Sequence, residues 1–281
     1  MKSKKSQEIV SMESYKKLYQ LFEEKGWMVE EDIHFSAFER YYRTLSSLDN
    51  NEQSFIIDLS KNFLHIPSDE YTRELIPAIK DLIQCISENI LYFTCCLPEG
   101  DIGKIKSSTT VLYKFKGTTI KQKVDFKEKS ISVVEDIKSL KKIDSFANRL
   151  IVLVDDFIGT GQTAEAAIDY VKKELTQLHD NSQIVVLSIV AHEMGIEFLS
   201  KLGIKVYATH KVRKGISDNY IGESLAKALE QMSEIENRLK KLKSEFRFGY
   251  GKSEALVCME RCPNNTFPIY WYTKNDAPYE R

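Results

Sequence analysis

Residues 151–163 read IVLVDDFIGTGQT, and this stretch decides the fold class of the chain. Four apolar residues, most of them β-branched, come first, which is typical of a strand buried on both faces of a parallel sheet. Gly159 and Gly161 then predict a turn, and from Ala164 onward the apolar residues recur at helical spacing. We therefore predict a strand, a glycine turn and a helix in direct succession.

The sequence around this stretch repeats the alternation of strands and helices. Apolar, β-branched runs alternate with amphipathic segments, which predicts a mostly parallel sheet whose strands are joined by right-handed crossovers. We expect an α/β fold of this kind. The predicted strands are ILYFTCCL at 90–97, RLIVLVDD at 149–156, QIVVLSIVA at 183–191 and IKVYATH at 204–210, and the predicted helices lie at 164–178 and 195–202.

The chain is predicted to have three parts. Residues 1–88 form a helical N-terminal layer, because their apolar residues recur at helical spacing. Residues 89–215 form the α/β core. Residues 216–281 form a long helix from Ile221 to about Ser244 and short C-terminal strands, all packed on the core.

Three local signals add detail to this plan. TTVLYKFK at 109–116 has strand propensity, whereas the alternation of elements puts a helix there, and both assignments remain open. Pro77 lacks a backbone N–H and is expected to kink or restart the last helix of the N-terminal layer. In the tail, ALVCM at 255–259 and FPIYWY at 267–272 predict two short strands.

The charge balance bears on the class of partner. Forty basic and 41 acidic residues give a net charge of -1, which argues against a global field that draws the chain to nucleic acid or to an anionic membrane. Only the cluster Lys240, Lys241 and Lys243 supports nucleic-acid binding, and such clusters more often form a solvated helix face. We expect nucleic acid to be involved only indirectly.

Cysteine usage and hydropathy indicate the compartment. The 5 cysteines are odd in number and irregularly spaced, which favours a reducing environment over a disulfide framework, and no ligand set at zinc-finger spacing predicts a structural metal. The apolar runs have the length of strands, and the first residues lack the apolar core of a signal peptide. We expect a cytoplasmic protein with no membrane segment.

The turn at 159–163 has the features of a phosphate site. The amides of Thr160, Gly161, Gln162 and Thr163 would lie at the positive end of a helix, where a phosphate monoester binds well. Gly159 and Gly161 allow the main chain to approach the phosphate closely, and the threonine hydroxyls add donors. We therefore predict that this loop binds a 5-phosphate.

Two acids, Asp155 and Asp156, precede the turn. Their carboxylates can accept hydrogen bonds from the two vicinal hydroxyls of a ribose whose 5-phosphate lies in the turn. A carboxylate near the ribose also favours positive charge at the anomeric carbon, as an oxocarbenium-like displacement requires. Magnesium, held mainly by a ligand's pyrophosphate and hydroxyls, would offset the negative charge, and we expect no metal ligand from the protein.

IVLVDDFIGTGQT resembles the signature of type I phosphoribosyltransferases: four apolar residues, two acids, then Thr-Gly-x-Thr. The resemblance implies that Asp155 and Asp156 bind the ribose hydroxyls of 5-phosphoribosyl-1-pyrophosphate (PRPP) and that residues 160–163 bind its 5-phosphate. It covers this loop directly, and the order of elements from about Ile90 to His210 agrees with the family's core. The N-terminal helices and the C-terminal tail lie outside the standard enzymes.

The same resemblance implies a second ligand loop, Pro98 to Ser108, that binds pyrophosphate after the first core strand. Gly100, Gly103 and Lys104 suit this task because backbone donors and an ammonium neutralise a diphosphate, although Glu99 and Asp101 in the same loop repel anions.

With the ending GYGKSEALVCMERCPNNTFPIYWY, these loops are similar to bacterial phosphoribosyltransferase-like proteins of conflict and anti-phage cassettes, including retrons. This similarity implies a protein partner, such as a reverse transcriptase or another cassette member, bound through the helical segments.

Two functions follow as expectations. The first is a transferase that moves phosphoribose from PRPP to an unidentified base or nucleophile, with no catalytic base that the sequence identifies. The second is a catalytically silent PRPP or nucleotide sensor, or a partner-binding scaffold. For the long helix, docking on its own domain is weighed against a homodimer seam.

Five further side chains have structural and functional interpretations. His192 and His210 are interpreted as hydrogen-bonded structural residues at the sheet edge. Asn264 and Asn265 either form a turn or hydrogen-bond to the edge of a base. Trp271 either belongs to the core or stacks on a base.

Overall fold

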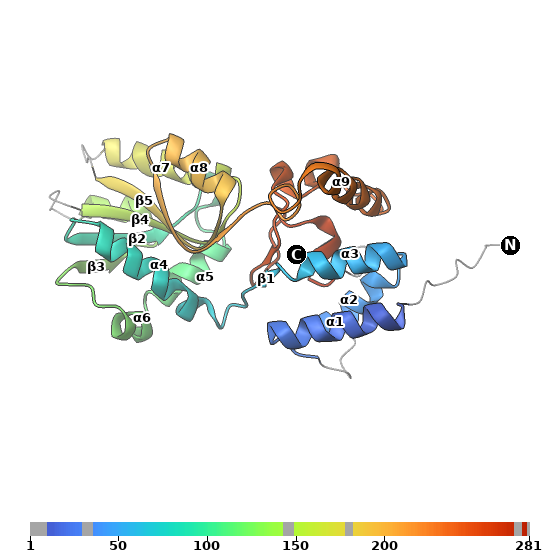
Figure 1. The fold of residues 1–281 in the computed structure, drawn as a ribbon. Helices are drawn as coiled ribbons and strands as arrows, with labels where there is room; N and C mark the ends of the chain where they lie inside the picture. The colour runs from blue at the N-terminus through green and yellow to red at the C-terminus, as the bar shows by residue number, and fades with distance from the viewer. Residues whose placement is uncertain (1–9, 30–35, 143–148, 178–181, 273–276, 280–281) are drawn as a thin grey trace. The chain divides into compact units, whose positions relative to one another are not determined.

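The computed structural model describes residues 10–29, 36–142, 149–177, 182–272 and 277–279. The chain forms two compact units (Figure 1). Unit 1 combines Met1–His65 with Arg213–Arg281, and unit 2 is Ile66–Val212. The start and the end of the chain therefore belong to one unit, and the α/β core is an uninterrupted segment between them.

Unit 2 is built on a five-stranded sheet in which every pair of neighbouring strands is parallel. The predicted α/β fold with a mostly parallel sheet is confirmed. The spatial order is β3-β2-β4-β5-β6, so the direction in which strands are added reverses between β2 and β4. The strands are β2 (Ile90–Cys95), β3 (Ser130–Val133), β4 (Arg149–Ile158), β5 (Gln183–His192) and β6 (Lys205–Val212).

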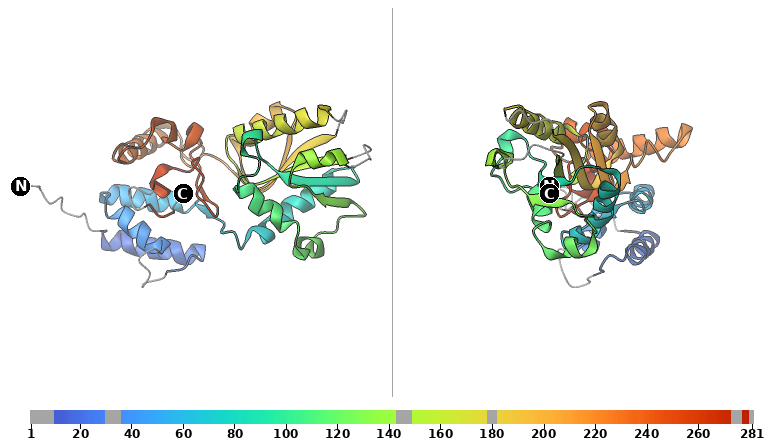
Figure 2. Two further views of the ribbon diagram at one scale, coloured as in Figure 1. Left: turned by 180° about the vertical axis from the view of Figure 1, so that it is seen from behind. Right: turned by 90° about the vertical axis from the view of Figure 1, so that its left-hand side faces the viewer.

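Helices cover both faces of this sheet. In Figures 1 and 2, α7 (Gln162–Gln177) and α8 (Glu193–Lys201) lie over one face, and α4 (Tyr71–Cys85) and α5 (Ser107–Lys114) over the other. Both faces of the sheet are thus buried, which explains the continuous apolar runs in its strands. The short helix α6 (Thr118–Lys123) follows α5.

The ambiguous segment 109–116 is helical and belongs mostly to α5. Its apolar side chains Val111, Leu112 and Phe115 are buried, and the Phe115 ring stacks on Phe93 of β2 with the ring centroids 4.4 Å apart. Packing against the sheet therefore overrides the strand propensity of Thr109, Thr110 and Val111.

Pro77 lies inside α4 and does not end the helix. Proline cannot supply its own N–H, and its ring disturbs the hydrogen bonds of the neighbouring turn. A hydroxyl from β6 repairs the turn: Ala78 N–H donates to Thr209 Oγ1 at 3.2 Å, and Thr209 Oγ1 donates to the Glu74 carbonyl. Of the two predicted outcomes, a restart of the helix at Pro77 is wrong, because the sheet supplies the hydrogen bonds that the helix lacks, and a kink stays a prediction.

Unit 1 packs three N-terminal helices against the C-terminal part of the chain. Its elements are α1 (Met12–Lys25), α2 (Ala37–Leu45), α3 (Asn50–Ser60), α9 (Gly222–Asn237), and the parallel pair β1 (Leu64–His65) and β7 (Val257–Cys258). Side chains start each of the first three helices: Ser11, Ser36 and Asp49 accept first-turn amides, and Asp49 forms a capping box with Glu52.

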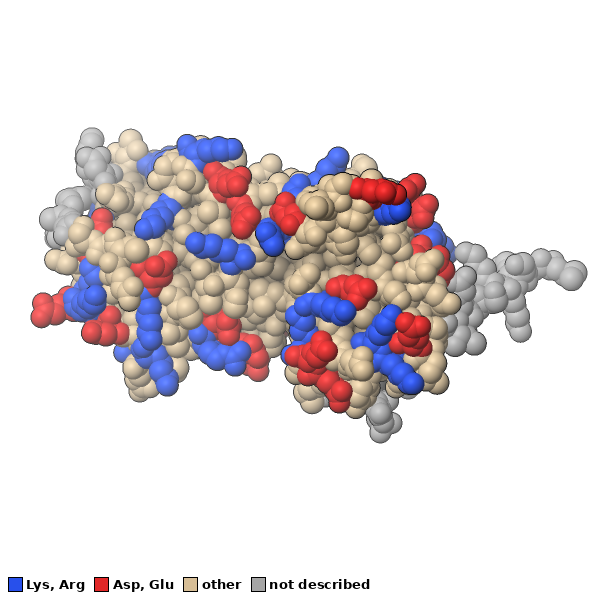
Figure 3. Space-filling model, in the orientation of Figure 1, with Lys and Arg blue, Asp and Glu red and all other residues tan. Residues whose placement is uncertain are grey.

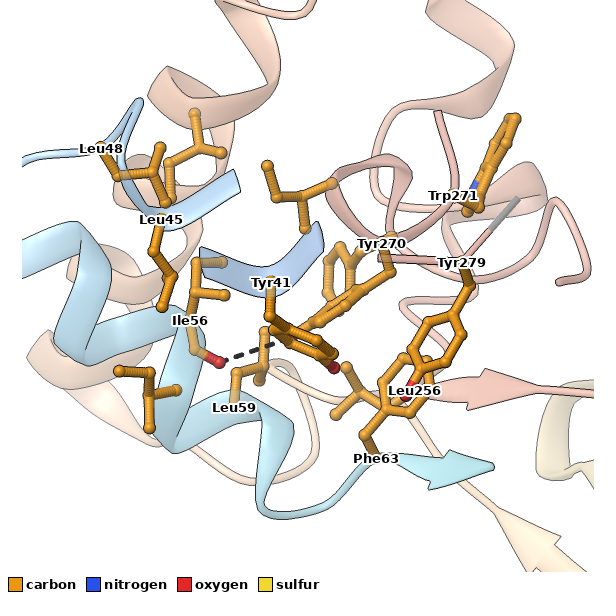
Figure 4. Packing of buried hydrophobic residues seen from close by; sticks show 14 of the residues in the cluster. Tyr41, Leu45, Leu48, Ile56, Leu59, Phe63, Leu256, Tyr270, Trp271 and Tyr279 are labelled. Atoms are coloured by element: carbon orange, nitrogen blue, oxygen red, sulfur yellow. Dashed lines mark hydrogen bonds between the residues drawn. The ribbon is translucent and has the colours of Figure 1, made fainter. Parts of the chain in front are cut away.

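The core of unit 1 is rich in aromatic residues. Phe63 stacks on Tyr279 with centroids 5.1 Å apart, and Tyr41 meets Tyr270 edge to face (Figure 4). Tyr270 Oη also bonds to Ser60 Oγ at 2.9 Å, so its buried hydroxyl is satisfied. Residues from the two ends of the chain thus share one hydrophobic core.

These units group the chain differently from the three predicted parts. The helix α4, expected in the N-terminal layer, belongs to unit 2, where Glu74 bonds to His210 of β6. The C-terminal segment shares its core with the N-terminal helices of unit 1. Helical spacing identifies which residues are buried in a helix, but it does not identify the neighbour that buries them.

Two C-terminal elements also differ from the prediction. The helix α9 ends at Asn237 rather than near Ser244, because tight turns follow and Lys241 has a positive φ of 61°. FPIYWY contains the 3-10 helix Pro268–Tyr270 instead of a strand, since proline favours the first position of a helix and Trp271 N–H donates to the Pro268 carbonyl. The apolar face of α9, with Ala228, Met232 and Ile235 buried, packs within unit 1 as the docked-helix interpretation expects.

Candidate functional site

The acid pair lies where the strand order reverses. β4 continues through Asp155 and Asp156 and ends at Ile158, and its neighbour β2 ends at Cys95, which is in register with Val154. The loops that follow β2 and β4 therefore leave the same edge of the sheet side by side. In open α/β sheets this switch point, at the carboxyl ends of the strands, is where ligands bind.

Both acids are buried and hydrogen-bonded. Asp155 is 9% exposed and Asp156 5%. Ser107 Oγ, at the start of α5, donates to Asp155 Oδ1 at 3.0 Å, and Tyr71 Oη, at the start of α4, donates to Asp156 Oδ2 at 2.8 Å. Asp155 Oδ1 also accepts the Asp156 N–H at 2.9 Å. Two hydroxyl groups and one backbone amide therefore donate to the two carboxyls.

The surroundings of Asp155 change its pKa. Burial and the adjacent Asp156 carboxyl raise the pKa of Asp155 well above its ordinary value, and the hydrogen bonds from Asp156 N–H and Ser107 only partly oppose this rise. The folded protein therefore favours the protonated form of Asp155 more than an isolated aspartate does.

The turn after β4 is shaped by close packing against α8. Gly161 has a φ of +88°, a conformation that favours glycine, and a Cβ there would lie 2.8 Å from Phe198 Cδ1. On the other side, a Cβ on Gly195 would collide with the Gly159 carbonyl. Gly161 of the turn and Gly195 of α8 thus have a steric reason to be glycine, independent of any ligand.

The same turn begins α7. Glu165 N–H donates to the Gly161 carbonyl at 2.8 Å, so the amides of the first helical turn have no acceptor within the helix itself. Thr160 is half-buried, whereas Gln162 and Thr163 are exposed. The residues predicted to bind the phosphate therefore lie together at the start of α7, a helix of 16 residues that begins a few residues after the acids.

The second predicted loop follows β2. Gly100 and Gly103 are exposed, and Gly103 has a φ of +82°. Asp101, which was expected to repel anions, pairs with Lys104 at 2.7 Å and Lys106 at 3.2 Å.

Glu99 of this loop pairs with Lys173 of α7 at 3.0 Å. Both acids of the loop therefore have basic partners, which reduces the expected repulsion. These pairs also occupy the Lys104 ammonium, so an incoming anion would compete with Asp101 for it.

Tyr71 and Ser107 are the site residues that the sequence did not identify. Ser107 lies near the end of the predicted pyrophosphate loop, Pro98 to Ser108, so its place near the acids could have been inferred from loop order. Tyr71 lies 85 residues before Asp156, and only the docking of α4 on the sheet brings the two together.

Other predicted candidates have structural roles. His192 Nδ1 accepts the Met194 N–H and caps α8, and His210 bonds to Glu74. Trp271 and Asn265 belong to unit 1, where Trp271 Nε1 donates to the Thr266 carbonyl and Asn265 bonds to the Tyr250 carbonyl. The turn-and-core interpretation of Asn265 and Trp271 thus accounts for their contacts.

Three further observations concern surface charge, metal binding and membrane-spanning helices. On the face shown in Figure 3, basic and acidic side chains are interspersed. Within the described ranges, no cluster of three or more His, Cys, Asp or Glu side chains is arranged to hold a metal ion. None of the helices in those ranges combines the length and apolar character needed to cross a membrane.

One family profile and several solved structures match parts of the chain. The profile of a family described as PRTase-CE matches residues 38–281. No curated protein matches the sequence.

The solved structures that match are phosphoribosyltransferases of low sequence identity. Orotate phosphoribosyltransferase of Mycobacterium tuberculosis H37Rv, in complex with PRPP, is 14% identical with a TM-score of 0.31, over 51% of this chain and 72% of that one. A phosphoribosyltransferase from Corynebacterium diphtheriae is 11% identical with a TM-score of 0.31, over 72% and 97% of the two chains. Orotate phosphoribosyltransferase from Aeropyrum pernix is 12% identical with a TM-score of 0.27, over 77% and 99%.

Proposed function

The chain belongs to the PRTase-CE family, and we propose that it binds PRPP at the carboxyl end of β4 and transfers the phosphoribosyl group to a base or another nucleophile. One observation carries the proposal: Asp155 and Asp156 end a buried central strand at the switch point of the sheet, and the glycine turn that follows opens α7. A phosphorylated diol fits this order of groups.

In the proposed pose, each part of the site binds a different part of PRPP. The 5-phosphate accepts hydrogen bonds from the first-turn amides of α7 and from Thr160 and Thr163, with the positive end of the helix dipole behind them. The ribose hydroxyls donate to the carboxyls of Asp155 and Asp156. The pyrophosphate lies against the loop after β2, where Gly100 and Gly103 leave the backbone open and Lys104 can turn from Asp101 to the anion.

The acids would also assist the chemistry. In phosphoribosyl transfer the anomeric carbon gains positive charge as the pyrophosphate leaves, and negative charge in a poorly solvated site stabilises this state. The oxygen-rich acid pair suits a ligand that arrives with Mg²⁺ on its pyrophosphate and hydroxyls, and the metal would neutralise charge on the leaving group. The protein positions the two reactants, and no separate base is assigned.

A PRPP sensor without turnover is the second candidate function. It is favoured by the low exposure of the acids, 9% and 5%, since a site used only for binding tolerates such enclosure. Release of pyrophosphate from PRPP in the presence of candidate bases separates the two functions, because only the transferase produces it.

On the resemblance of the two loops and the C-terminal ending, we also propose a role in bacterial conflict or anti-phage systems of the retron kind. The protein partner would be a reverse transcriptase or another product of the same cassette. Phage plating on cells that carry the wild type or an acid-pair variant, with and without the neighbouring genes, tests this role.

The binding proposal is tested by calorimetric titration of PRPP with Mg²⁺. We expect Asp155→Asn/Asp156→Asn to weaken binding by about 100-fold or more, because two hydrogen bonds from the sugar to charged acceptors are each worth about 1.5–3 kcal/mol. Its melting temperature should stay close to that of the wild type, since the amides preserve shape and remove repulsion.

Asp169→Asn is the matched control, because Asp169 is an exposed acid on α7 outside the proposed site. This control should bind PRPP like the wild type. Equal affinity of the wild type and the double variant would remove the proposed site.

A further inference from the structure

Each acid of the pair is held by a hydroxyl from the first residue of a different helix. Tyr71 begins α4 and donates to Asp156 Oδ2 at 2.8 Å. Ser107 begins α5 and donates to Asp155 Oδ1 at 3.0 Å. Neither residue belongs to the strand and turn that carry the acids, so the two contacts are tertiary.

These contacts distinguish the oxygens within each carboxyl. Asp155 Oδ1 is also bonded by the Asp156 N–H, so that oxygen has two protein donors. The remaining oxygens are Asp155 Oδ2 and Asp156 Oδ1. Among the described residues, the hydrogen bonds from Ser107, Tyr71 and the Asp156 N–H all end on Asp155 Oδ1 and Asp156 Oδ2. One oxygen of each acid is therefore left to accept from a ligand.

We propose that Tyr71 and Ser107 are positioning residues that aim the acid pair at a vicinal diol. Tyr71 fixes Asp156 so that Oδ1 receives one sugar hydroxyl, and Ser107 fixes Asp155 so that Oδ2 receives the other. The proposal rests on the proposed function and deepens it, because it names the residues that make the site selective for a ribose over a deoxyribose.

The surroundings of Tyr71 explain why it can act in this way. Its side chain is fully buried. The helix that carries it is attached to β6 through His210 Nε2 and Glu74 Oε2, 2.7 Å apart, and through the Thr209 hydroxyl at Pro77. A donor on so firmly attached a helix holds the Asp156 carboxyl in one rotamer before the ligand arrives, which reduces the entropy lost on binding.

Ser107 is a weaker restraint on its acid. It is an exposed residue at the end of a loop, and the Asp156 N–H holds the same Asp155 oxygen. Loss of the Ser107 hydroxyl therefore leaves Asp155 partly fixed, whereas loss of the Tyr71 hydroxyl leaves Asp156 Oδ2 without its donor. The two residues should differ in importance, with Tyr71 the greater.

The test compares Tyr71→Phe and Ser107→Ala with the wild type in two measurements. The first is the affinity for PRPP with Mg²⁺. The second is the ratio of affinities for ribose 5-phosphate and 2-deoxyribose 5-phosphate, each measured by displacement of PRPP. This ratio measures how strongly the site prefers a ribose to a deoxyribose, and a general loss of stability does not change it.

We expect the wild type to prefer the ribose sugar by about tenfold or more, the value of one hydrogen bond to a charged acceptor. Tyr71→Phe should bind PRPP about tenfold more weakly and should prefer the ribose sugar by less than about threefold, because its Asp156 can rotate. Ser107→Ala should show a smaller loss in both measurements. Tyr113→Phe, which removes an exposed tyrosine hydroxyl on α5, is the control and should match the wild type.

The outcomes separate this proposal from the proposed function. If the wild type does not bind PRPP, the function itself fails. If the wild type binds and the acid-pair variant does not, yet Tyr71→Phe keeps the wild-type affinity and sugar preference, the positioning role alone is overturned. Tighter binding by Tyr71→Phe would overturn it too, because Tyr71 would then compete with the sugar for Asp156.

Discussion

The negative charge of Asp155 lowers the stability of the folded protein. Burial and the Asp156 carboxyl raise its pKa in the folded protein well above the value of about 3.9 that an aspartate has in an unfolded chain. The folded state therefore holds the proton more tightly than the unfolded state does. Stability from this group is complete below pH of about 3.9 and is lost as the pH rises through the folded pKa.

This sign gives a prediction for Asp155→Asn. An asparagine can still accept from Ser107 Oγ and Asp156 N–H, and its amide can donate to the Asp156 carboxylate, so the pair stays satisfied without a titrating proton. We expect the melting temperature of the variant to exceed that of the wild type at pH 8, and the difference to shrink as the pH falls toward about 4.

Thermal unfolding at several pH values checks this prediction, with Asp169→Asn as the exposed control. Each kcal/mol corresponds to about 2–4 °C in a domain of this size. A difference that is constant with pH would show that the pKa of Asp155 is not raised in the folded protein.

The helix α4 depends on a side chain of the sheet beneath it. Thr209 accepts from Ala78 N–H and donates to the Glu74 carbonyl, and thereby takes the place of a helical hydrogen bond next to Pro77. Thr209→Val keeps the shape and removes both bonds. We expect a loss of about 1–3 kcal/mol, because two backbone groups are left unsatisfied in a part-buried position. Thr209→Ser, which keeps the hydroxyl, should lose less than half of this.

A double-mutant cycle tests whether Pro77 is the reason why α4 needs the Thr209 hydroxyl. Pro77→Ala removes the ring, so the Ala78 N–H can reach the Glu74 carbonyl without a hydroxyl between them. Thr209→Val should then cost clearly less in the Pro77→Ala background than in the wild type, as measured by denaturant unfolding. Equal costs in both backgrounds would mean that Thr209 serves the sheet and not the helix.

Elements whose signal is local could be predicted from the sequence. The strands at Ile90–Cys95 and Arg149–Ile158 and the turn at Gly161 follow from apolar runs and from a glycine that occupies a positive φ. Only a few residues separate the acid pair from the turn, so their proximity follows from the sequence alone.

Features that depend on distant partners could not be predicted. The continuation of α4 through Pro77 depends on Thr209, and the restraint of Asp156 depends on Tyr71, at sequence separations of more than 80 residues. Likewise, FPIYWY alternates like a strand, but Pro268 and the aromatic core around Tyr270 favour a 3-10 turn. Periodicity identifies which side chains share a face of a helix or strand. Tertiary packing determines which other part of the protein that face contacts.

At the scale of the whole molecule, the two units have separate hydrophobic cores. Phe63 and Tyr270 belong to the core of unit 1, and Leu153 and Leu199 to the core of unit 2. A core that buries its own apolar residues tends to unfold as one cooperative step. We therefore expect two calorimetric transitions, one for each unit.

A ligand and a core substitution should act on different transitions. PRPP with Mg²⁺ at about 100 times its dissociation constant adds about 2.7 kcal/mol to the unit that binds it, so the transition of unit 2 should rise by roughly 5–10 °C while the other stays in place. Phe63→Ala removes a fully buried ring from unit 1, which costs about 3–5 kcal/mol, and should lower only the transition that PRPP does not move. Differential scanning calorimetry of the full chain tests both at once. A single transition that responds to the ligand and to the substitution alike would show that the units fold as one cooperative body, and binding at Asp155 and Asp156 would then be coupled energetically to the aromatic core of unit 1.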